Sequence, residues 1–595
     1  MCGIAGWSLV AGRVCNPSQL ANMAEAITHR GPDDYGVYID ESAGIALAHR
    51  RLSIIDLSAA GHQPMVSVHG NVVLVFNGEL YNYIELRKEL EQLGLVFRSR
   101  SDTEVVLSAL AHWGADALKR FDGMFALAAW YPLERKLLLA RDPLGMKPLY
   151  YTTCGLEGGI AFASEIKAFL RLQGFSAKAN PRSIKQYLEF GYVFDEHDTS
   201  LAGVCKLPPG HAMEIIAGRA NDPYAYFAPR MTEKRNEWTL EQTIDELHAT
   251  LSKVVHQHLV ADVPVGLLLS GGLDSSIIAA LAAKDARVAT ISMGFADSAV
   301  DERGYARTVA KHIGSDHREV LIHQREIVDN LEEVVWYFDD LFADWGTVST
   351  RLLYMKCREQ GIKVVLVGEG SDELFGGYSV FDAAQQGRGP ILWQLFHLYR
   401  LYAGRRYGGR FVQYAAIMRR YLALCGGSMF DAVRLFESRN QLPNNYVMKV
   451  DKASMSVSVE ARAPYLDRRV AELAYSLPAN FLIAEGTNKF ILRSMAERHR
   501  LLPKEITRRA KFGASIAASW MDSSEEFRRY ARNVILSRDG WAERLGLEKA
   551  MTDFFDGKRM GYSFPRAISI FSNLAWRLLL LQLWSRRYLG FDESR

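Results

Sequence analysis

Short apolar runs separated by turn signals fill the first 215 residues, a pattern typical of β-strands. Residues 125–132, 136–143 and 148–153 are predicted to be successive strands of one sheet, and residues 203–216 a turn and a last strand. Residues 72–83 predict a strand and a turn into a helix, because apolar side chains then recur at helical spacing as far as Leu93. A mixed domain of sheets and helices is therefore expected here.

The pattern changes at about residue 239, where long helical segments alternate with short, wholly apolar runs. The runs at 263–269, 288–295 and 363–367 each lead through a loop into a helical pattern. This alternation predicts a parallel sheet with helices on both faces. Residues 218–238 are polar, contain two prolines and lack periodicity. We therefore predict three parts: a domain over 1–217, a linker over 218–238 and an α/β domain over 239–595 whose later part is helical.

Composition narrows the classes of function. The 595 residues are 49% hydrophobic and 23% charged, which is ordinary for a globular protein of several domains. The formal net charge is only +3, so no nucleic-acid partner is expected. The six cysteines have neither the density of a disulfide scaffold nor a zinc-type spacing, which favours a reducing compartment.

No segment predicts a membrane partner. The apolar run at 578–584 is far shorter than the roughly 20 residues that span a bilayer, and we expect a buried helix there. The opening residues carry no basic residue before Arg13, unlike a secretory signal. A cytoplasmic location is predicted, and whether the chain forms a homodimer is left open.

The motif SGGLDSS, residues 270–276, lies between an apolar run and a helical pattern. Glycine lets backbone N–H groups approach a ligand and a helix start offers unpaired donors, so the motif suits a phosphate. The members that supply backbone or hydroxyl donors are Ser270, Gly271, Gly272, Ser275 and Ser276. Asp274 stands where a Walker loop has lysine, and a carboxylate beside phosphate implies a bridging Mg²⁺. A helix N-cap with a tight turn is the alternative interpretation.

Two further segments carry carboxylates. GEGSDELFGGY, residues 368–378, follows another predicted strand, so Glu369, Asp372 and Glu373 are expected at the same sheet edge as Ser270. Asp372 joins Asp274 as a candidate Mg²⁺ ligand. Three more carboxylates have an ambiguous role: Asp339, Asp340 and Asp344. Four cations are available for a polyphosphate or an anionic transition state: Lys449, Lys452, Lys489 and Arg493.

The chain opens with MCG. Removal of methionine before a small residue would leave Cys2 with a thiol and a free α-amine. The pKa of such an amine is about 8, so it can act as a general base near neutral pH. The sulfur is then activated as a nucleophile without a histidine. A buried, unreactive cysteine is the alternative.

Nearby motifs favour the catalytic interpretation. HRGPDDYG, HRRLSIID, FNGELYNY and SDTE all lie between residues 29 and 104. The Asn77 side chain and the Gly78 N–H are placed to stabilise an oxyanion. Arg51 is suited to grip an α-carboxylate and Asp102 to pair with an α-ammonium. An amino acid cleaved at its side-chain amide meets these needs, which predicts glutamine as substrate.

Several of these motifs together resemble known families. MCGIAGW, RGPDDYG, RRLSIID, FNGELYNY and RDPLGMKPLYY resemble the class II, or N-terminal-nucleophile, glutamine amidotransferases. SGGLDSS, GEGSDELFGGY and VEARAPYLD resemble the synthetase half of glutamine-hydrolysing asparagine synthetase. The resemblance implies an N-terminal-nucleophile αββα domain followed by an α/β domain with a parallel sheet flanked by helices.

The resemblance also implies a mechanism. Cys2 would form a glutamyl thioester and release ammonia, which crosses an internal tunnel to a carboxylate activated by ATP as acyl-AMP. The implied glutamine-binding residues are Arg51, Asn77, Gly78, Glu79 and Asp102. The implied nucleotide-lining residues, beside the 270–276 loop, are Leu268, Met293, Val367 and Gly368. Glu369 is implied in adenylate formation, and Lys489 in balancing charge on the departing pyrophosphate.

Two departures bear on the acceptor. Residues 345–350 read WGTVST where many family members have a sequence close to PSAIPT, and residues 510–517 lack the family's late proline. Trp345 would change the shape of the acceptor crevice, so a sugar acid or natural-product precursor is kept as an alternative to aspartate. A ring-closing synthetase or a non-catalytic sensor is disfavoured because the nucleophile and loop motifs are intact. SGGLDSS disfavours a sugar-phosphate amidotransferase.

Overall fold

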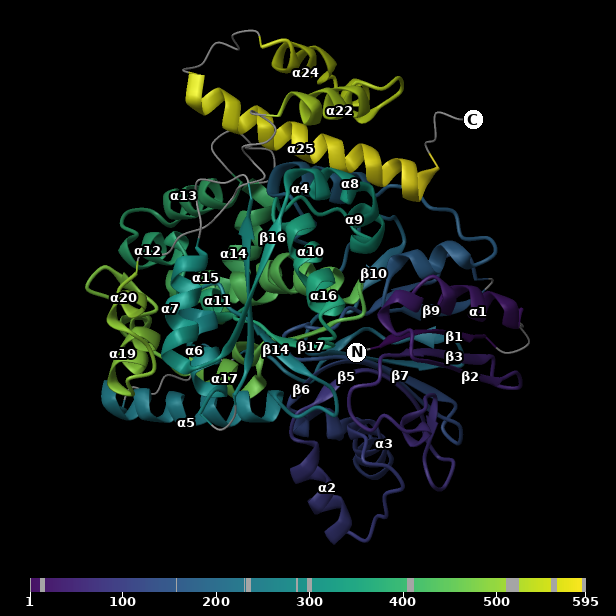
Figure 1. The fold of residues 1–595 in the computed structure, drawn as a ribbon. Helices are drawn as coiled ribbons and strands as arrows, with labels where there is room; N and C mark the ends of the chain where they lie inside the picture. Colours follow the sequence, from purple (N-terminus) through teal and green to yellow (C-terminus); the bar gives the residue numbers. More distant parts are fainter. Residues whose placement is uncertain are drawn as a thin grey trace.

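The computed structural model describes residues 2–10, 16–156, 158–229, 231, 237–284, 287–296, 302–403, 411–509, 524–557 and 564–590, the side chains of 564–571 excepted. The N-terminal part is rich in strands, and the rest of the chain forms a larger, mostly helical part packed against it (Figure 1).

Two antiparallel sheets form the N-terminal domain. The first has the order β10 (Val204–Lys206), β8 (Tyr150–Thr152), β9 (Gly159–Ala163), β1 (Gly3–Leu9), β3 (Ile45–Arg51) and β2 (Asp34–Asp40). The second has the order β12 (Arg219–Ala220), β11 (His211–Ile216), β7 (Lys136–Arg141), β6 (Gly123–Tyr131), β5 (Val73–Leu80) and β4 (Met65–Val66). The three strands expected in one sheet are present, but β8 lies in a different sheet from β6 and β7.

Alternation of side chains gives each sheet two apolar faces. Ile4, Val75 and Phe162 belong to the core between the two sheets. Helices α2 (Tyr83–Gln92) and α3 (Asp102–Trp113) pack with the outer face of the second sheet, where Leu127 is buried. Helix α1 (Pro17–Glu25) packs with Trp7 on the outer face of the first sheet. The expected αββα arrangement is confirmed.

A five-stranded parallel sheet organises the C-terminal domain. Its order is β16 (Asp316–Ile322), β15 (Ala289–Phe295), β14 (Val265–Leu268), β17 (Val364–Leu366) and β18 (Glu460–Arg462). Helices α6 (Leu273–Ala282) and α7 (Arg303–Ile313) lie on one side, with α10 (Thr347–Glu359) and α16 (Val447–Met455) on the other (Figure 1). The strand order reverses between β14 and β17, so a crevice for ligands is expected at their carboxyl ends.

The segment predicted to be a linker contains regular structure. Strands β12 and β13 (Tyr224–Ala225) both pair with β11, so the second sheet continues past residue 217. Helix α5 (Leu240–His258) then begins with a capping box in which the Thr239 and Gln242 side chains bond each other's backbone N–H groups. Short strands paired at a sheet edge leave little periodicity in a sequence.

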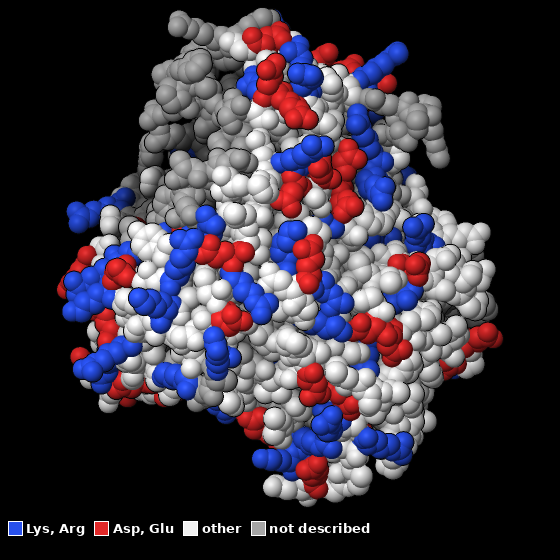
Figure 2. All heavy atoms as spheres, viewed as in Figure 1, with Lys and Arg blue, Asp and Glu red and all other residues white. Residues whose placement is uncertain are grey.

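The last described helix is α25 (Phe564–Leu589), which contains the apolar run at 578–584. Leu578, Leu579 and Leu581 are buried, so the expected buried helix is confirmed. The helix packs on α9 (Leu331–Phe338) and α22 (Glu525–Ile535). Within the described residues, no helix combines the length and the apolar character needed to cross a membrane. Positive and negative side chains are interspersed over the face drawn in Figure 2.

Candidate active sites

Cys2 lies directly before β1 and is buried. Its backbone N–H donates to Asn77 Oδ1 at 3.0 Å. The other end of that amide, Asn77 Nδ2, is buried and has no hydrogen-bond partner among the described residues. An unpaired buried donor is rare and calls for a ligand. The Asn77 amide, whose Oδ1 already binds Cys2, is thus able to donate to an oxyanion that forms on an amide carbon attacked by the thiol.

A small cavity of about 20 Å³ brings predicted residues from distant segments together. It is lined by Cys2, Arg51, Gly78, Glu79 and Asp102, all of which the sequence had singled out. At Gly78 an added Cβ would lie 2.2 Å from the Met124 carbonyl oxygen, so pairing of β5 with β6 admits only glycine.

Charged groups in this cavity already have partners. The Arg51 guanidinium donates to the carbonyl oxygen of Ser58 at 3.0 Å and thereby holds the loop that follows β3. Asp102 accepts from the Leu80 N–H at 2.9 Å, and burial raises its pKa to about 6. Glu79 Oε1 lies 3.1 Å from Arg462 Nη2, a contact from the C-terminal domain.

The surroundings of the Cys2 thiol act on its pKa in opposite directions. Burial raises the pKa of the Cys2 thiol, while a hydrogen bond from the Leu52 N–H and the charge of Arg51 oppose the shift.

The cavity is also lined by polar residues that were not predicted from the sequence: Gln63, Ser101 and Thr103. Gln63 ties the loop before β4 to β5 and α3, because its Oε1 accepts from the Phe76 N–H at 2.7 Å and its Nε2 donates to Thr103 Oγ1 at 3.2 Å. Met1 lies outside the described residues, so the α-amine as base stays a prediction.

A second cavity, of about 780 Å³, opens at the carboxyl ends of β14 and β17. Seven of the predicted nucleotide residues line it: Leu268, Ser270, Asp274, Ser275, Met293, Val367 and Gly368. The other three shape the loop. Gly271 has φ +72°, and an added Cβ would lie 2.6 Å from the Ala306 backbone nitrogen. Gly272 precedes α6, and Ser276 is buried within its first turn.

The two candidate magnesium ligands converge on one cation. Lys489 Nζ lies 2.7 Å from Asp274 Oδ2 and 2.7 Å from Asp372 Oδ1. Burial lowers the pKa of Lys489, but the two carboxylates outweigh that effect and raise it. Gly377 leaves room for this group, because an added Cβ would lie 1.8 Å from Asp372 Oδ1. Both carboxylates therefore face a position suited to positive charge beside the phosphate loop.

Burial raises the pKa of two other carboxylates of this cavity, Glu369 and Glu373. Burial raises the pKa of Glu369, and Lys449 opposes the shift. Burial, with the charge of Asp372, raises the pKa of Glu373 to about 7, although the Tyr378 hydroxyl donates to it at 2.6 Å. Asp344 lines the same cavity and lies 3.5 Å from Lys449 Nζ.

One wall of the second cavity comes from segments whose role the sequence did not show. The Trp345 ring stacks on Trp576 of α25 with ring centroids 4.5 Å apart. Trp345 Nε1 donates to Asn573 Oδ1 at 2.8 Å, and Asn573 and Arg577 both line the cavity. Tyr446 ends a π-helical segment, Glu437–Tyr446, a form frequent at functional sites.

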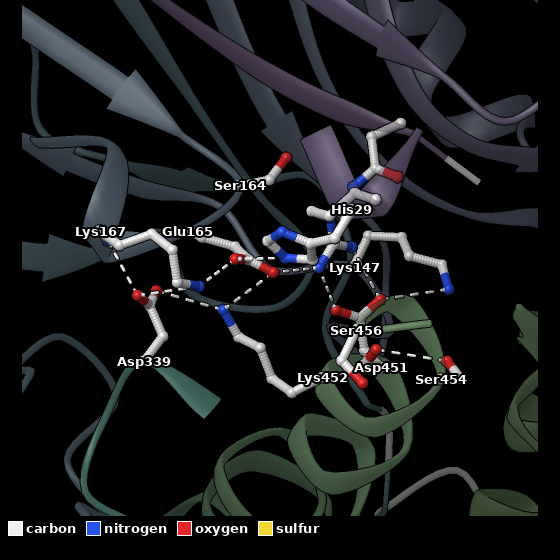
Figure 3. Close-up of polar contacts among 12 residues, drawn as sticks. His29, Lys147, Ser164, Glu165, Lys167, Asp339, Asp451, Lys452, Ser454 and Ser456 are labelled. Atoms are coloured by element: carbon white, nitrogen blue, oxygen red, sulfur yellow. Dashed lines mark hydrogen bonds and ion pairs between the residues drawn. The ribbon is translucent and has the colours of Figure 1, made fainter. Parts of the chain in front are cut away.

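Buried charges of the two domains pair with one another across the domain boundary (Figure 3). Asp451 on α16 lies 2.9 Å from Arg30 Nη1 and 3.6 Å from Lys147 Nζ. Arg30 also lies 2.9 Å from Glu165 and donates through Nε to the Cys2 carbonyl oxygen at 3.1 Å. The network therefore joins the backbone of the nucleophile to a helix of the other domain.

Two other cations that were expected at the phosphates also have partners within the protein. Lys452 Nζ lies 3.3 Å from Asp339 Oδ2 in the network of Figure 3. Arg493 donates to the carbonyl oxygens of Asn488 and Arg509 at 3.0 and 3.2 Å. Like Lys489, neither is among the residues that line the second cavity.

Two family models match this chain, one over its N-terminal part and one over its C-terminal part. Residues 1–227 match the model of the glutamine amidotransferase domain, and residues 246–586 match the model of asparagine synthase. The chain belongs to the asparagine synthase family. The family resemblance expected from the sequence motifs is confirmed.

Relatives of this asparagine synthase family member align over most of their length. The putative glutamine-hydrolysing asparagine synthetase of Mycobacterium tuberculosis is 32% identical, over 98% of this chain and 97% of the relative. Asparagine synthetase 1 of Bacillus subtilis is 31% identical over 87% and 86%, and asparagine synthetase B of Escherichia coli 30% over 88% and 84%. The solved glutamine phosphoribosylpyrophosphate amidotransferase of Bacillus subtilis has 16% identity and a TM-score of 0.29, covering 62% of this chain and 81% of its own, too distant to support an argument.

Membership defines the class of reaction. This family member is a carbon–nitrogen ligase of the glutamine-dependent asparagine synthetase type, and ATP is a substrate.

Proposed function

We infer that this ligase transfers the amide nitrogen of glutamine to aspartate, giving asparagine. The observation that best supports aspartate as the acceptor is a pair of charged side chains in the nucleotide cavity. Asp344 Oδ1 and Lys449 Nζ lie 3.5 Å apart and line this cavity together with Glu369. Aspartate carries an ammonium and a second carboxylate besides the reacting one. A carboxylate and an ammonium on one wall complement both groups.

The first half-reaction is assigned to the pocket at Cys2. The sulfur attacks the glutamine amide carbon, and its proton passes to the α-amine of a processed N-terminus. The Asn77 Nδ2 and the Gly78 N–H stabilise the oxyanion, while Arg51 and Asp102 bind the α-carboxylate and α-ammonium. Collapse releases ammonia and leaves a thioester, which water hydrolyses to glutamate. Ammonia then passes between the domains, sheltered from protonation by bulk water.

The second half-reaction is assigned to the larger cavity. An oxygen of the acceptor carboxylate attacks the α-phosphorus of ATP and pyrophosphate leaves; ammonia then attacks the acyl carbon and AMP leaves. The 270–276 loop cradles the pyrophosphate, Lys489 balances its charge, and Glu369 assists adenylate formation. Leu268, Met293, Val367 and Gly368 line the nucleotide.

Magnesium fits this arrangement through Asp274 and Asp372. The two carboxylates already converge on the single ammonium of Lys489 at 2.7 Å each. Among the described residues no group of three His, Cys, Asp or Glu is placed to hold a metal ion. Two carboxylates completed by substrate phosphates are a typical Mg²⁺ environment in nucleotide sites. When bound, the ion would neutralise phosphate charge beside these side chains.

A larger carboxylate, such as a sugar acid, is the second candidate because of Trp345. Asp344 and Lys449 line the same cavity as Trp345. The indole adds an aromatic wall that is held by Trp576 and Asn573. Sugar rings commonly pack on aromatic faces of this kind.

The test is acceptor-dependent exchange between ATP and labelled pyrophosphate. Aspartate should stimulate exchange in the wild type, and also in Cys2→Ala, whose second site is untouched. Stimulation by a sugar acid but not by aspartate would replace aspartate by the second candidate. Exchange with neither acceptor in a protein that still hydrolyses glutamine would contradict both.

A further inference from the structure

The segment between Asp382 and Asp431 has an unusual charge. Residues 383–430 contain seven arginines and no Asp, Glu or Lys, a formal charge of +7 in a chain whose total is +3. The remainder of the chain is therefore net negative. Most of this segment forms two helices that pack together, α13 (Ile391–Ala403) and α14 (Phe411–Leu424), here called the arginine hairpin. Residues 404–410, which join them, lie outside the described structure.

Helix α13 is apolar on both faces. Its inner face buries Leu395, Leu398 and Tyr399 against the rest of the domain. Its outer face exposes large apolar side chains: Leu392, Trp393, Phe396 and Leu401. Trp393 is 70% exposed. A helix that is hydrophobic all round is normally covered on every side, so the outer face indicates a partner.

Arginines lie on this apolar face and on the neighbouring helix α14. Arg400 lies over the Phe396 ring on the same side of α13, with its guanidinium carbon 5.8 Å from the ring centroid. On α14, Val412 is 80% exposed, and Arg419 and Arg420 are exposed further along. Apolar side chains flanked by arginines are typical of helices that lie in the interface of an anionic bilayer, where the apolar groups enter and the cations meet headgroups.

Other occupants fit the surface less well. A second copy of the hairpin would set its three arginines, Arg400, Arg419 and Arg420, against the same three. A nucleic acid would meet the arginines and find aromatic rings at Trp393 and Phe396, but the exposed aliphatic groups of Leu392, Leu401 and Val412 offer it no hydrogen bonds. An anionic phospholipid surface satisfies both halves of the pattern, and tryptophan is enriched at that interface.

We propose that the arginine hairpin docks this enzyme on an anionic phospholipid surface. This is a peripheral contact through short helices, and it departs from the expectation of no membrane partner. The surface lies close to the chemistry, because Tyr399 on the inner face of α13 contacts Phe190 with ring centroids 6.0 Å apart. Phe190 lines the nucleotide cavity.

The test measures binding of the full chain to vesicles by co-sedimentation, without substrates. Vesicles of phosphatidylcholine with phosphatidylglycerol should retain the protein, vesicles of phosphatidylcholine alone should not, and added salt should weaken retention. Trp393→Ser should lower the partition constant about tenfold, since the exposed indole is the largest apolar group of the face. Leu133→Ser, which removes an 89% exposed leucine from the N-terminal domain, is the matched control and should bind like the wild type.

Independent readouts separate the outcomes. Glutaminase activity in solution should be unchanged in both variants, which shows that they are folded and keeps this test distinct from the proposed acceptor. Equal retention on both kinds of vesicle, or no retention on either, overturns the proposal. So does an oligomer in ultracentrifugation that Trp393→Ser dissociates, because the hairpin would then be a contact between copies.

Discussion

The two sites differ in how closely the protein surrounds them. The pocket at Cys2 has a cavity of about 20 Å³, closed in part by the Arg51 contact that holds the loop after β3. The nucleotide cavity measures about 780 Å³ and is lined by loops of several elements. In the proposed mechanism the first site releases ammonia that must be kept from bulk water, and a small, enclosed cavity suits that step. The second has to admit a nucleotide and release pyrophosphate, which requires an open mouth.

The Cys2→Ala substitution should have the largest effect and should separate the activities of the two sites. Glutamine-dependent synthesis should fall by about 10⁵-fold, because no other group replaces the sulfur as nucleophile. Synthesis with ammonia should stay near the wild-type rate, since the second cavity contains no atom of Cys2. Steady-state rates with each nitrogen source measure both. Cys154→Ala, at a half-buried cysteine outside both cavities, is the control. Equal loss with glutamine and ammonia would contradict the separation of sites.

Lys489→Met should break the other site alone. Pyrophosphate exchange should fall by about 10³-fold, because the departing group loses its cation and Asp274 then repels Asp372 uncompensated. Glutamine hydrolysis should persist within a factor of a few. Lys504→Met, at an exposed lysine of the same domain, should change neither rate. Unaltered exchange in Lys489→Met would remove the lysine from the mechanism.

Asn77→Asp tests the smaller site more finely. The substitution keeps an oxygen for the Cys2 N–H and replaces the unpaired Nδ2 donor with an acceptor. Glutaminase kcat should fall by about 10²-fold with a smaller change in KM, because the lost hydrogen bond forms mainly in the transition state. Asn22→Asp on an exposed turn of α1 is the matched control. A rise in KM alone would assign Asn77 to substrate binding.

The smallest effect is a pH dependence confined to the glutamine site. Burial raises the pKa of Asp102 to about 6, so below that pH the carboxyl is protonated and no longer attracts the α-ammonium. The value of kcat/KM for glutamine should therefore fall about tenfold per pH unit below 6. The rate of pyrophosphate exchange should not show this acidic limb, the fall in activity below pH 6. Asp102→Asn should lower kcat/KM and abolish the limb; a limb that persists belongs to another group.

The sequence by itself determined the two chemistries, because each depends on local patterns. A cysteine beside the start of a strand, an Asn–Gly pair in a strand, and a glycine–serine loop between strand and helix are each encoded over a few residues. Alternating apolar runs likewise predicted the parallel sheet. Position 271 shows the physical reason, since the turn before α6 gives it a φ of +72°, a backbone conformation that favours glycine.

Only the tertiary structure decided which distant residues meet. Lys452, Lys489 and Arg493 are all cations of the same late segment, yet the first pairs with Asp339, the second with Asp274 and Asp372, and the third with three backbone carbonyls. The stacking of Trp345 on Trp576 and the link from Cys2 through Arg30 to Asp451 join segments hundreds of residues apart. Such contacts depend on packing between domains, and no local periodicity records them.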